Sequence, residues 1–580
     1  MSSVNISFYR KFSYIKIPYI ITYVAGLLLL VMFYTLNYQV DMNSGEVKYR
    51  DNFFAKNEAG LFKPIKNTAI GNKFYTRYFE NKEKEILFNK SSENIKNNFV
   101  NIFSSDYSGI SVHDWYKEIQ YAKVIKNSLS NREIPFHVNN LSKILKVKED
   151  RFMGAPIWSL SPQVILLLFL SPLGFIFVNH LLLYTIGTYG LIKITSVYDL
   201  KYPAFLFLFL IFNFNGYMIE KFAAYGFGQL GYYFIPFVIL YFIKMTEHVK
   251  NSQEHKEQVK NSIFLGVSLA LIMWQGSLHL FVQLITFFIF WVVFNYSKLK
   301  YIFISCFVAC ILSAYKILPA AVAFGGAPNG YKATGYTDPL MIIKSFIYPT
   351  SQLTWPAFHW WELSLYISVF GFILLMKYSI VDPLLKFEYV HKRFNYKVYI
   401  PIFIMVILSL WKFSEYLIPD FIPLLNSESH PARYAIIPLL MLSVIATFNI
   451  SKYIDAATLA KRMVLYLMLF FLVIFMIDHV LLWRLLKIQA EVNWLFSNPD
   501  ASIFGLDIIA QKNGAMEHES NKLSIDNRYN DSYYIISFYL GSLISIFSLM
   551  YIFRMFYQEI YCSLKFNVSR YLNMFKQLKS

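Results

Sequence analysis

Long apolar runs recur along almost the whole chain, separated by short polar stretches. The first run, at 17–36, has about the twenty residues that an α-helix needs to cross a hydrocarbon layer of ~30 Å. Hydrophobic residues make up 56% of the 580 and charged residues only 16%, below the ~25% of soluble domains. Because backbone polar groups in lipid must be paired within the segment, runs of helix length predict an all-α polytopic membrane protein.

Lys and Arg gather in alternate connections, which indicates which side of the membrane each connection occupies. Arg10, Lys11 and Lys16 precede the first run, so the N-terminus is expected in the cytoplasm. Followed along the chain, this pattern predicts about twelve transmembrane helices with large external loops. The predicted divisions are a cytoplasmic N-terminus with the first transmembrane helix (1–36), a first external domain (37–160), a multi-span core (161–486) with an external loop (319–361), a further external loop (487–532), and a last transmembrane helix with a basic cytoplasmic tail (533–580).

The first external domain contains a polar stretch with helical periodicity. Its apolar residues recur at three- and four-residue steps and predict one buried stripe: Trp115, Ile119, Ala122, Ile125 and Leu129. Asp114 stands at the N-terminal edge of this helix. Two interpretations are open, because the carboxylate either forms a capping box with Ser111 or serves as a general base toward an acceptor hydroxyl.

Polar residues also lie where external loops are expected to meet the membrane. His359 and Glu362 occupy one such boundary, and His430 and Arg433 occupy another. Each of these side chains could be functional, or could reach out to lipid headgroups as interfacial residues commonly do.

Asp478 and His479 lie inside an apolar run, where ionisable side chains are costly. They are therefore candidates for a functional site, with a structural hydrogen bond between helices as the alternative. Arg484 and Lys487 add positive charge at the expected outer end of the same helix. Such cations would suit a phosphate-bearing lipid.

Several chemistries are excluded by the motifs that they require. The sequence has no Gly-rich phosphate loop with a Lys-Ser/Thr ending, no HExxH and no Gly-x-Ser-x-Gly. The three cysteines have neither disulfide nor metal-ligand spacing. The net charge of +18 is typical of cytoplasmic Lys and Arg retention, and no nucleic-acid partner is expected.

Several stretches in a fixed order resemble bacterial GT-C-type integral-membrane glycosyltransferases. The acidic HDWYKEIQ, with REIPF about twenty residues later, resembles the first external loop of that family. The other stretches follow in order: FMGAPIWSLSPQVILL, NHLLLYTIGTYGLIKI, FNGYMIEKFAAYGFGQLGYYFIPFVIL, WQGSLHLF, WWELSLYISVFGFILL and HPARY.

The resemblance implies transfer of a sugar from a polyprenyl-phosphate donor to a lipid-linked glycan, lipopolysaccharide or other envelope acceptor. The reaction would be inverting and would take place on the external face of the bacterial inner membrane, among membrane lipids. The resemblance implies Asp114 as catalytic base, Glu362 as a second site carboxylate and Arg433 as a donor-phosphate contact. His430 and Arg484 are expected to assist with the phosphate. No cofactor is required, and a divalent cation is left open.

The sequence departs from the family pattern in three places. The insert 37–104 is longer than usual, FHV at 136–138 replaces Trp-Asn-Pro, and Gly-Gln at 228–229 replaces Gly-His. The insert leaves Asp106 and Asp41 as rivals to Asp114. His359 and Asp478 are secondary site candidates. The alternatives to a transferase are a flippase or transporter of a lipid-linked oligosaccharide and an accessory subunit.

Overall fold

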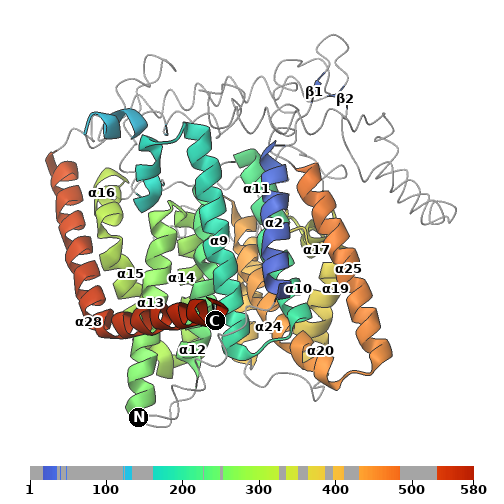
Figure 1. The fold of residues 1–580 in the computed structure, drawn as a ribbon. Coiled ribbons are helices and arrows are strands. Elements are labelled where there is room, and N and C mark those ends of the chain that lie inside the picture. The colour runs from blue at the N-terminus through green and yellow to red at the C-terminus, as the bar shows by residue number, and fades with distance from the viewer. Residues whose placement is uncertain are drawn as a thin grey trace.

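Figure 1 shows a computed structural model of the chain, and almost all of the elements that it describes are helices. The residues described are 17–35, 39–40, 47–48, 122, 125–132, 158, 161–225, 227–247, 252–324, 335–349, 363–385, 396–410, 430–483 and 532–579. A two-residue antiparallel pair, β1 (Gln39–Val40) and β2 (Val47–Lys48), is the only strand pairing among them. An all-α fold is confirmed at this level.

The helices follow one another with short connections. The first half contains α2 (Ile17–Thr35), η5 (Pro162–Leu168), α9 (Pro172–Tyr198), α10 (Tyr202–Phe214), α11 (Gly216–Tyr225), η6 (Phe227–Phe234), α12 (Ile235–Thr246), α13 (Ser252–Trp274) and α14 (Leu278–Val293). The second half contains η7 (Tyr296–Lys298), α15 (Leu299–Leu312), α16 (Ala314–Phe324), α17 (Pro339–Ile347), α19 (Ser368–Met376), η9 (Lys377–Val381), α20 (Asp382–Leu384), α21 (Tyr396–Ser409), η10 (Pro431–Ala435), α24 (Ile436–Ala456), α25 (Leu459–Leu482) and α28 (Ser532–Lys579).

The boundaries of α9 illustrate how the sequence sets these helices. Ser171 caps the helix by accepting a 3.0 Å hydrogen bond from Gly174 N, and Pro172 occupies the first helical position, where its missing N–H is harmless. At the other end Asp199 adopts a left-handed conformation with φ 55° and terminates the helix. The preceding apolar piece, expected to be too short to cross, is the seven-residue 3₁₀ helix η5.

Seven segments are long and apolar enough to cross a membrane. They are Ile17–Tyr34, Pro172–Tyr198, Tyr202–Ala223, Gly228–Thr246, Pro431–Ala456, Leu459–Leu482 and Ser532–Tyr557. Two shorter apolar helices, Leu278–Val293 and Lys397–Ser409, pack among them. The structure therefore describes a helical bundle of membrane type, while the figure of about twelve crossings remains a prediction.

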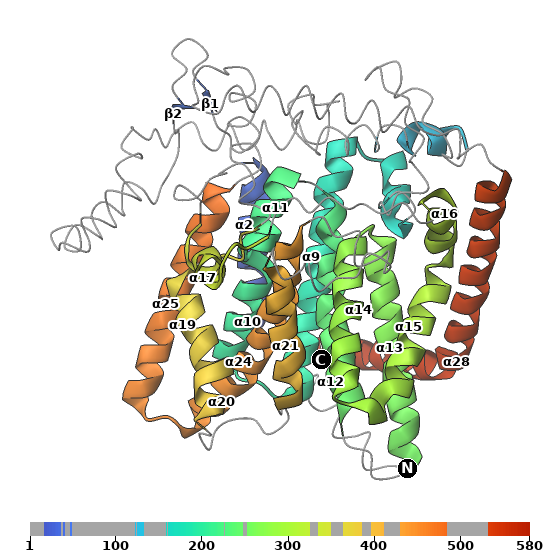
Figure 2. The same cartoon turned by 180° about the vertical axis from the view of Figure 1, so that it is seen from behind.

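Burial distinguishes central helices from peripheral ones. The apolar window of α24 is completely buried, whereas those of α25 and α28 are only 33% and 17% buried. The exposed faces of α25 and α28 carry large apolar side chains, as helices that face lipid do. Figures 1 and 2 show α24 within the bundle and these two helices on opposite flanks.

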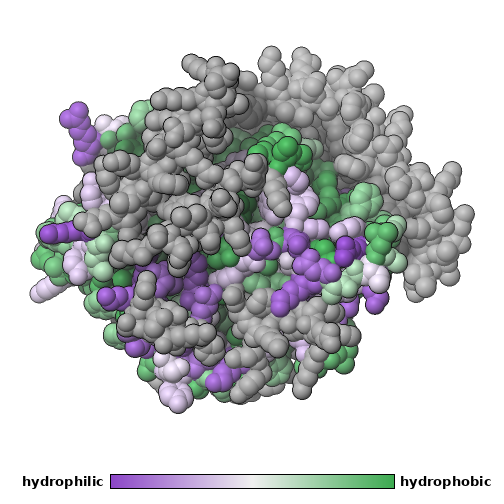
Figure 3. Space-filling model, turned by 60° about the horizontal axis from the view of Figure 1, so that its bottom comes forward, coloured by the Kyte–Doolittle hydropathy of each residue, from purple (hydrophilic) through white to green (hydrophobic). Residues whose placement is uncertain are grey.

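The two ends of the bundle differ in polarity. Hydrophilic residues gather over the end seen in Figure 3, where α9 meets α10 and α24 meets α25. Lys201 forms a 3.1 Å ion pair with Asp455 at this end, and Lys377 forms a 2.9 Å pair with Asp382. Figure 1 shows α11 and α17 at the opposite end.

The predicted amphipathic helix is described only in part. Ala122 and Ile125 are buried against the bundle and Leu129 packs beside them, whereas Asn127 is exposed. Lys126 Nζ donates a 3.1 Å hydrogen bond to Leu170 O, which ties this segment to the start of α9. The stripe is confirmed for these three apolar residues. Trp115 and Ile119 lie outside the described residues.

Candidate functional site

The candidate site is built on a break in one apolar segment. Helix α10 ends at Phe214, Asn215 is extended with φ −66° and ψ 163°, and α11 begins at Gly216. Asn215 Nδ2 donates to Ile211 O at 2.7 Å, and its Oδ1 accepts from Met218 N at 3.0 Å. One amide thus closes the end of α10 and caps the start of α11, so the break is stable although Asn215 is fully buried.

Gly216 lets another segment of the chain approach this break. Its N–H donates a 2.9 Å hydrogen bond to Tyr366 O, in the extended stretch before α19. A Cβ at Gly216 would lie 2.5 Å from Tyr366 N and would also collide with Ser364 Oγ. Only glycine therefore permits the close packing that brings Ser364 and Tyr366 to α11.

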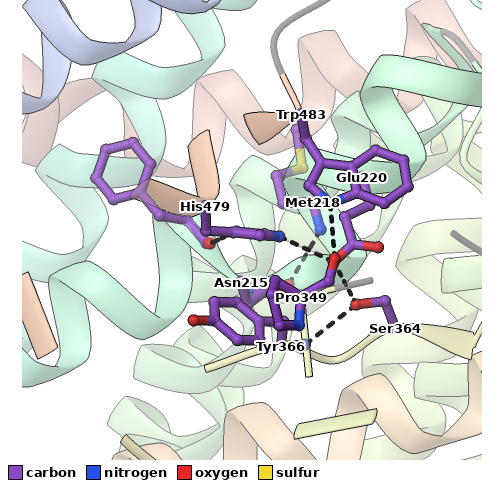
Figure 4. Close-up of polar contacts among 9 residues, drawn as sticks. Asn215, Met218, Glu220, Pro349, Ser364, Tyr366, His479 and Trp483 are labelled. Atoms are coloured by element: carbon purple, nitrogen blue, oxygen red, sulfur yellow. Dashed lines mark hydrogen bonds and ion pairs between the residues drawn. The ribbon is translucent and has the colours of Figure 1, made fainter. Parts of the chain in front are cut away.

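Glu220, on α11, is the centre of the site (Figure 4). Its side chain is completely buried, and so is that of His479 near the end of α25. Glu220 Oε1 accepts a 2.6 Å hydrogen bond from Ser364 Oγ and lies 2.8 Å from His479 Nε2. Three segments that are distant in sequence therefore meet at one carboxylate oxygen.

The surroundings of His479 determine where its protons lie. Nδ1 faces Phe214 O at 3.2 Å, at the end of α10, and the ring lies against Tyr366 with centroids 4.4 Å apart. Because a carbonyl can only accept, Nδ1 must carry a proton. A second proton then lies on the line between Nε2 and Glu220 Oε1. The pair is neutral overall, either as imidazolium and carboxylate or as imidazole and carboxylic acid.

The second carboxylate oxygen of Glu220 has a different environment. Oε2 is buried and has no hydrogen-bond partner among the described residues. The neighbouring Lys221 is also completely buried, with Nζ 4.4 Å from the centroid of the Tyr217 ring. An unpartnered buried acceptor is costly, so Oε2 is the atom of this cluster that is available to a further donor.

Of the residues predicted from sequence, three lie in the described part of the chain. Arg433, in η10, is only 1% exposed, so it does not reach out to headgroups. His430 precedes η10, is partly buried, and accepts a 3.0 Å hydrogen bond from Arg433 N through its carbonyl. Asp478 is partly exposed, and it is the adjacent His479 that joins the cluster. The remaining candidates lie outside the described residues: Asp41, Asp106, Asp114, His359, Glu362 and Arg484.

Sequence reasoning did not single out Glu220. Its stretch, FNGYMIEKFAAYGFGQLG, had been divided between a predicted span ending at Tyr217 and an external turn, so an acidic residue there attracted no attention. The signal was nevertheless present, since an ionisable residue in apolar sequence is a functional candidate by the same argument that selected Asp478 and His479. Its partner 259 positions away could not be read from the sequence.

Comparison of the chain with protein-family models, with curated proteins and with solved structures finds no significant match. Within the described ranges, no group of three or more His, Cys, Asp and Glu side chains could hold a metal ion. The site is therefore interpreted from its own geometry.

Proposed function

We propose that this protein is an integral-membrane glycosyltransferase. It takes a sugar from a polyprenyl-phosphate donor and transfers it to a lipid-linked glycan, lipopolysaccharide or other envelope acceptor at the external face of the bacterial inner membrane. About twelve crossings, with the basic end of the bundle in the cytoplasm, belong to the same proposal.

The observation that carries the proposal is the buried Glu220–His479 pair at a break in an apolar segment. Buried ionisable groups among apolar helices are expensive and are retained mainly where they act on a substrate or bind one. Figure 1 shows α11, which carries Glu220, at the end of the bundle opposite the basic end, so the pair lies toward the expected external side. The resemblance drawn from sequence order supplies the class of reaction.

The proposed reaction needs few groups, because the donor brings its own leaving group. Asp114 takes the proton of the acceptor hydroxyl while the acceptor oxygen forms a bond to the anomeric carbon. The bond from that carbon to the phosphate oxygen breaks, and its electron pair leaves with the polyprenyl phosphate. Arg433, with His430 and Arg484, would hold the departing phosphate, and Glu362 is a second carboxylate for the site. A divalent cation could share that task.

A flippase or transporter of a lipid-linked oligosaccharide is the competing function. The observation that favours it is the broken α10–α11 segment, because discontinuous helices with a buried proton-sharing pair are typical of transporter binding sites. The predicted external loops favour the transferase, since a transport site near mid-membrane needs no large external domain.

Sugar transfer in detergent separates the two functions, because flipping has no meaning without a bilayer. The purified chain would be given radiolabelled undecaprenyl-phosphate sugars and lipid-linked acceptors, and product would be followed by chromatography. Wild type should form product, and Asp114→Asn should bind donor normally but turn over at least about a hundredfold more slowly. Asp106→Asn and Asp41→Asn are the matched controls. If only one of these is inactive, the base is misassigned; if no chain forms product with any donor, the transferase proposal is wrong.

A further inference from the structure

We infer that Glu220 Oε2 recognises the sugar of the donor by accepting a hydrogen bond from one of its hydroxyl groups. This inference rests on the proposed function and adds a specificity-determining residue to it. Neither the sequence motifs nor the resemblance singled out Glu220.

The protonation of the cluster leaves Oε2 with one possible role. The mobile proton lies between His479 Nε2 and Glu220 Oε1, and Ser364 Oγ also donates to Oε1. Oε2 therefore carries no proton in either form of the pair, as a carboxylate oxygen or as the carbonyl oxygen of the acid. It can only accept a hydrogen bond, so its ligand must be a donor.

This requirement discriminates between the parts of a polyprenyl-phosphate sugar. The phosphodiester is an anion whose oxygens only accept, so it would be repelled by Oε2 and left unpaired beside it. The polyprenyl chain has no polar group. Sugar hydroxyls are the donors that the molecule offers, and a fixed acceptor discriminates strongly against an analogue that lacks the matching hydroxyl.

The cluster holds Oε2 in place rather than leaving it free to rotate toward another partner. Oε1 is fixed by two contacts, and the ring of His479 is held between Phe214 O and Tyr366. One helical turn further on, Trp483 Nε1 donates a 2.8 Å hydrogen bond to Pro349 O (Figure 4). A preorganised acceptor of this kind gains affinity because little ordering remains when the ligand binds.

The test compares two lipids that differ only in the sugar. Affinities of the detergent-solubilised full chain for undecaprenyl-phosphate sugars and for undecaprenyl phosphate alone would be measured for wild type, Glu220→Gln and Asp478→Asn. Glu220→Gln keeps the volume of the side chain but places an N–H₂ donor at one of the two oxygens. Asp478→Asn makes the same chemical change one residue from His479, outside the hydrogen-bonded cluster.

Wild type should bind the sugar-bearing lipid more tightly than the bare lipid. Glu220→Gln should lose about 10- to 100-fold in affinity for the sugar-bearing lipid, as expected for a lost hydrogen bond to a charged group. Its affinity for the bare lipid should be unchanged, and Asp478→Asn should match wild type for both. If Glu220→Gln does not fold, Glu220→Asp, which keeps the charge but retracts the acceptor, should show a smaller loss of the same kind.

Two results would overturn the inference. In one, Glu220→Gln binds both lipids as wild type does and is only less stable, which would make the pair a structural tie between α11 and α25 or a site for water. In the other, wild type does not distinguish the two lipids. Sugar-dependent binding without any transfer would instead refute the transferase proposal and leave the recognition role intact.

Discussion

Gly216 donates its backbone N–H to Tyr366 O at 2.9 Å, and a Cβ at Gly216 would lie only 2.5 Å from Tyr366 N. This contact joins the break between α10 and α11 to the segment that supplies Ser364. Backbone atoms cannot move away as a flexible side chain can, so the absence of a side chain at residue 216 determines whether the candidate site assembles.

Gly216→Ala should therefore destabilise the protein by about 1–3 kcal/mol, the usual cost of overpacking, or prevent folding. Thermal unfolding of the detergent-solubilised chain measures the effect. Gly228→Ala is the matched control, because no atom lies within 4 Å of the Cβ position at Gly228. Equal melting temperatures for the two variants would show that the approach of Tyr366 to α11 is not tight.

Removing one member of the Glu220–His479 pair should cost more than removing both. His479→Phe leaves a buried carboxylate supported by Ser364 alone, and such losses typically cost about 3–5 kcal/mol. The double variant Glu220→Met/His479→Phe replaces both groups with apolar ones and should recover most of that stability. Chemical unfolding of the two single variants and the double variant gives the coupling energy. Additive effects would mean that the two side chains do not interact.

Arg433→Lys should weaken binding of the donor lipid. Lysine keeps the positive charge but loses the planar fork that can hold two phosphate oxygens, so the loss should appear in donor affinity rather than in turnover. Arg462→Lys is the control, because Arg462 lies by the polar end of the bundle and donates to Ala457 O at 2.9 Å. Unchanged donor affinity in Arg433→Lys would remove this buried arginine from the donor site.

Asp338 predicts a local dependence on pH. Its carboxylate caps α17 by accepting a 2.8 Å hydrogen bond from Met341 N, which lowers the pKa of Asp338 with help from the Thr337 hydroxyl. A lowered pKa means that the cap is fully present above the unfolded-state pKa of about 3.9 and is lost as pH falls through the folded-state value. Amide exchange in the first turn of α17 should accelerate over that range. Asp338→Asn, which caps without titrating, should remove the dependence.

The predicted topology can be tested with single cysteines in a chain from which the native cysteines have been removed. Ser92→Cys and Asn513→Cys lie in the predicted external segments 37–160 and 487–532 and should react with an impermeant reagent in intact spheroplasts. Ser297→Cys, exposed in η7 between two lysines, should react only after lysis. Protection of either external position would contradict the assignment. The cysteines to be replaced are Cys306, Cys310 and Cys562.

The sequence alone predicted the helical class and much of the helix placement, because apolar runs and their flanking Pro and charged residues are local signals. The predicted first span at 17–36 corresponds to α2, and the short piece at 161–171 contains η5. The break at Asn215 was not predicted. It depends on a cap that one side chain makes to both helices, and the apolar pattern runs through it unchanged.

The site divides in the same way. Sequence identified Asp478 and His479 as unusual because any ionisable residue in an apolar run is costly, and that cost is local. Which of the two matters, and that His479 meets Glu220, Ser364 and Phe214 O, was decided only when α10, α11, α25 and the stretch before α19 packed together. Hydrogen bonds require atoms within about 3 Å in the right direction, and residues 259 positions apart have no such relationship until the chain has folded.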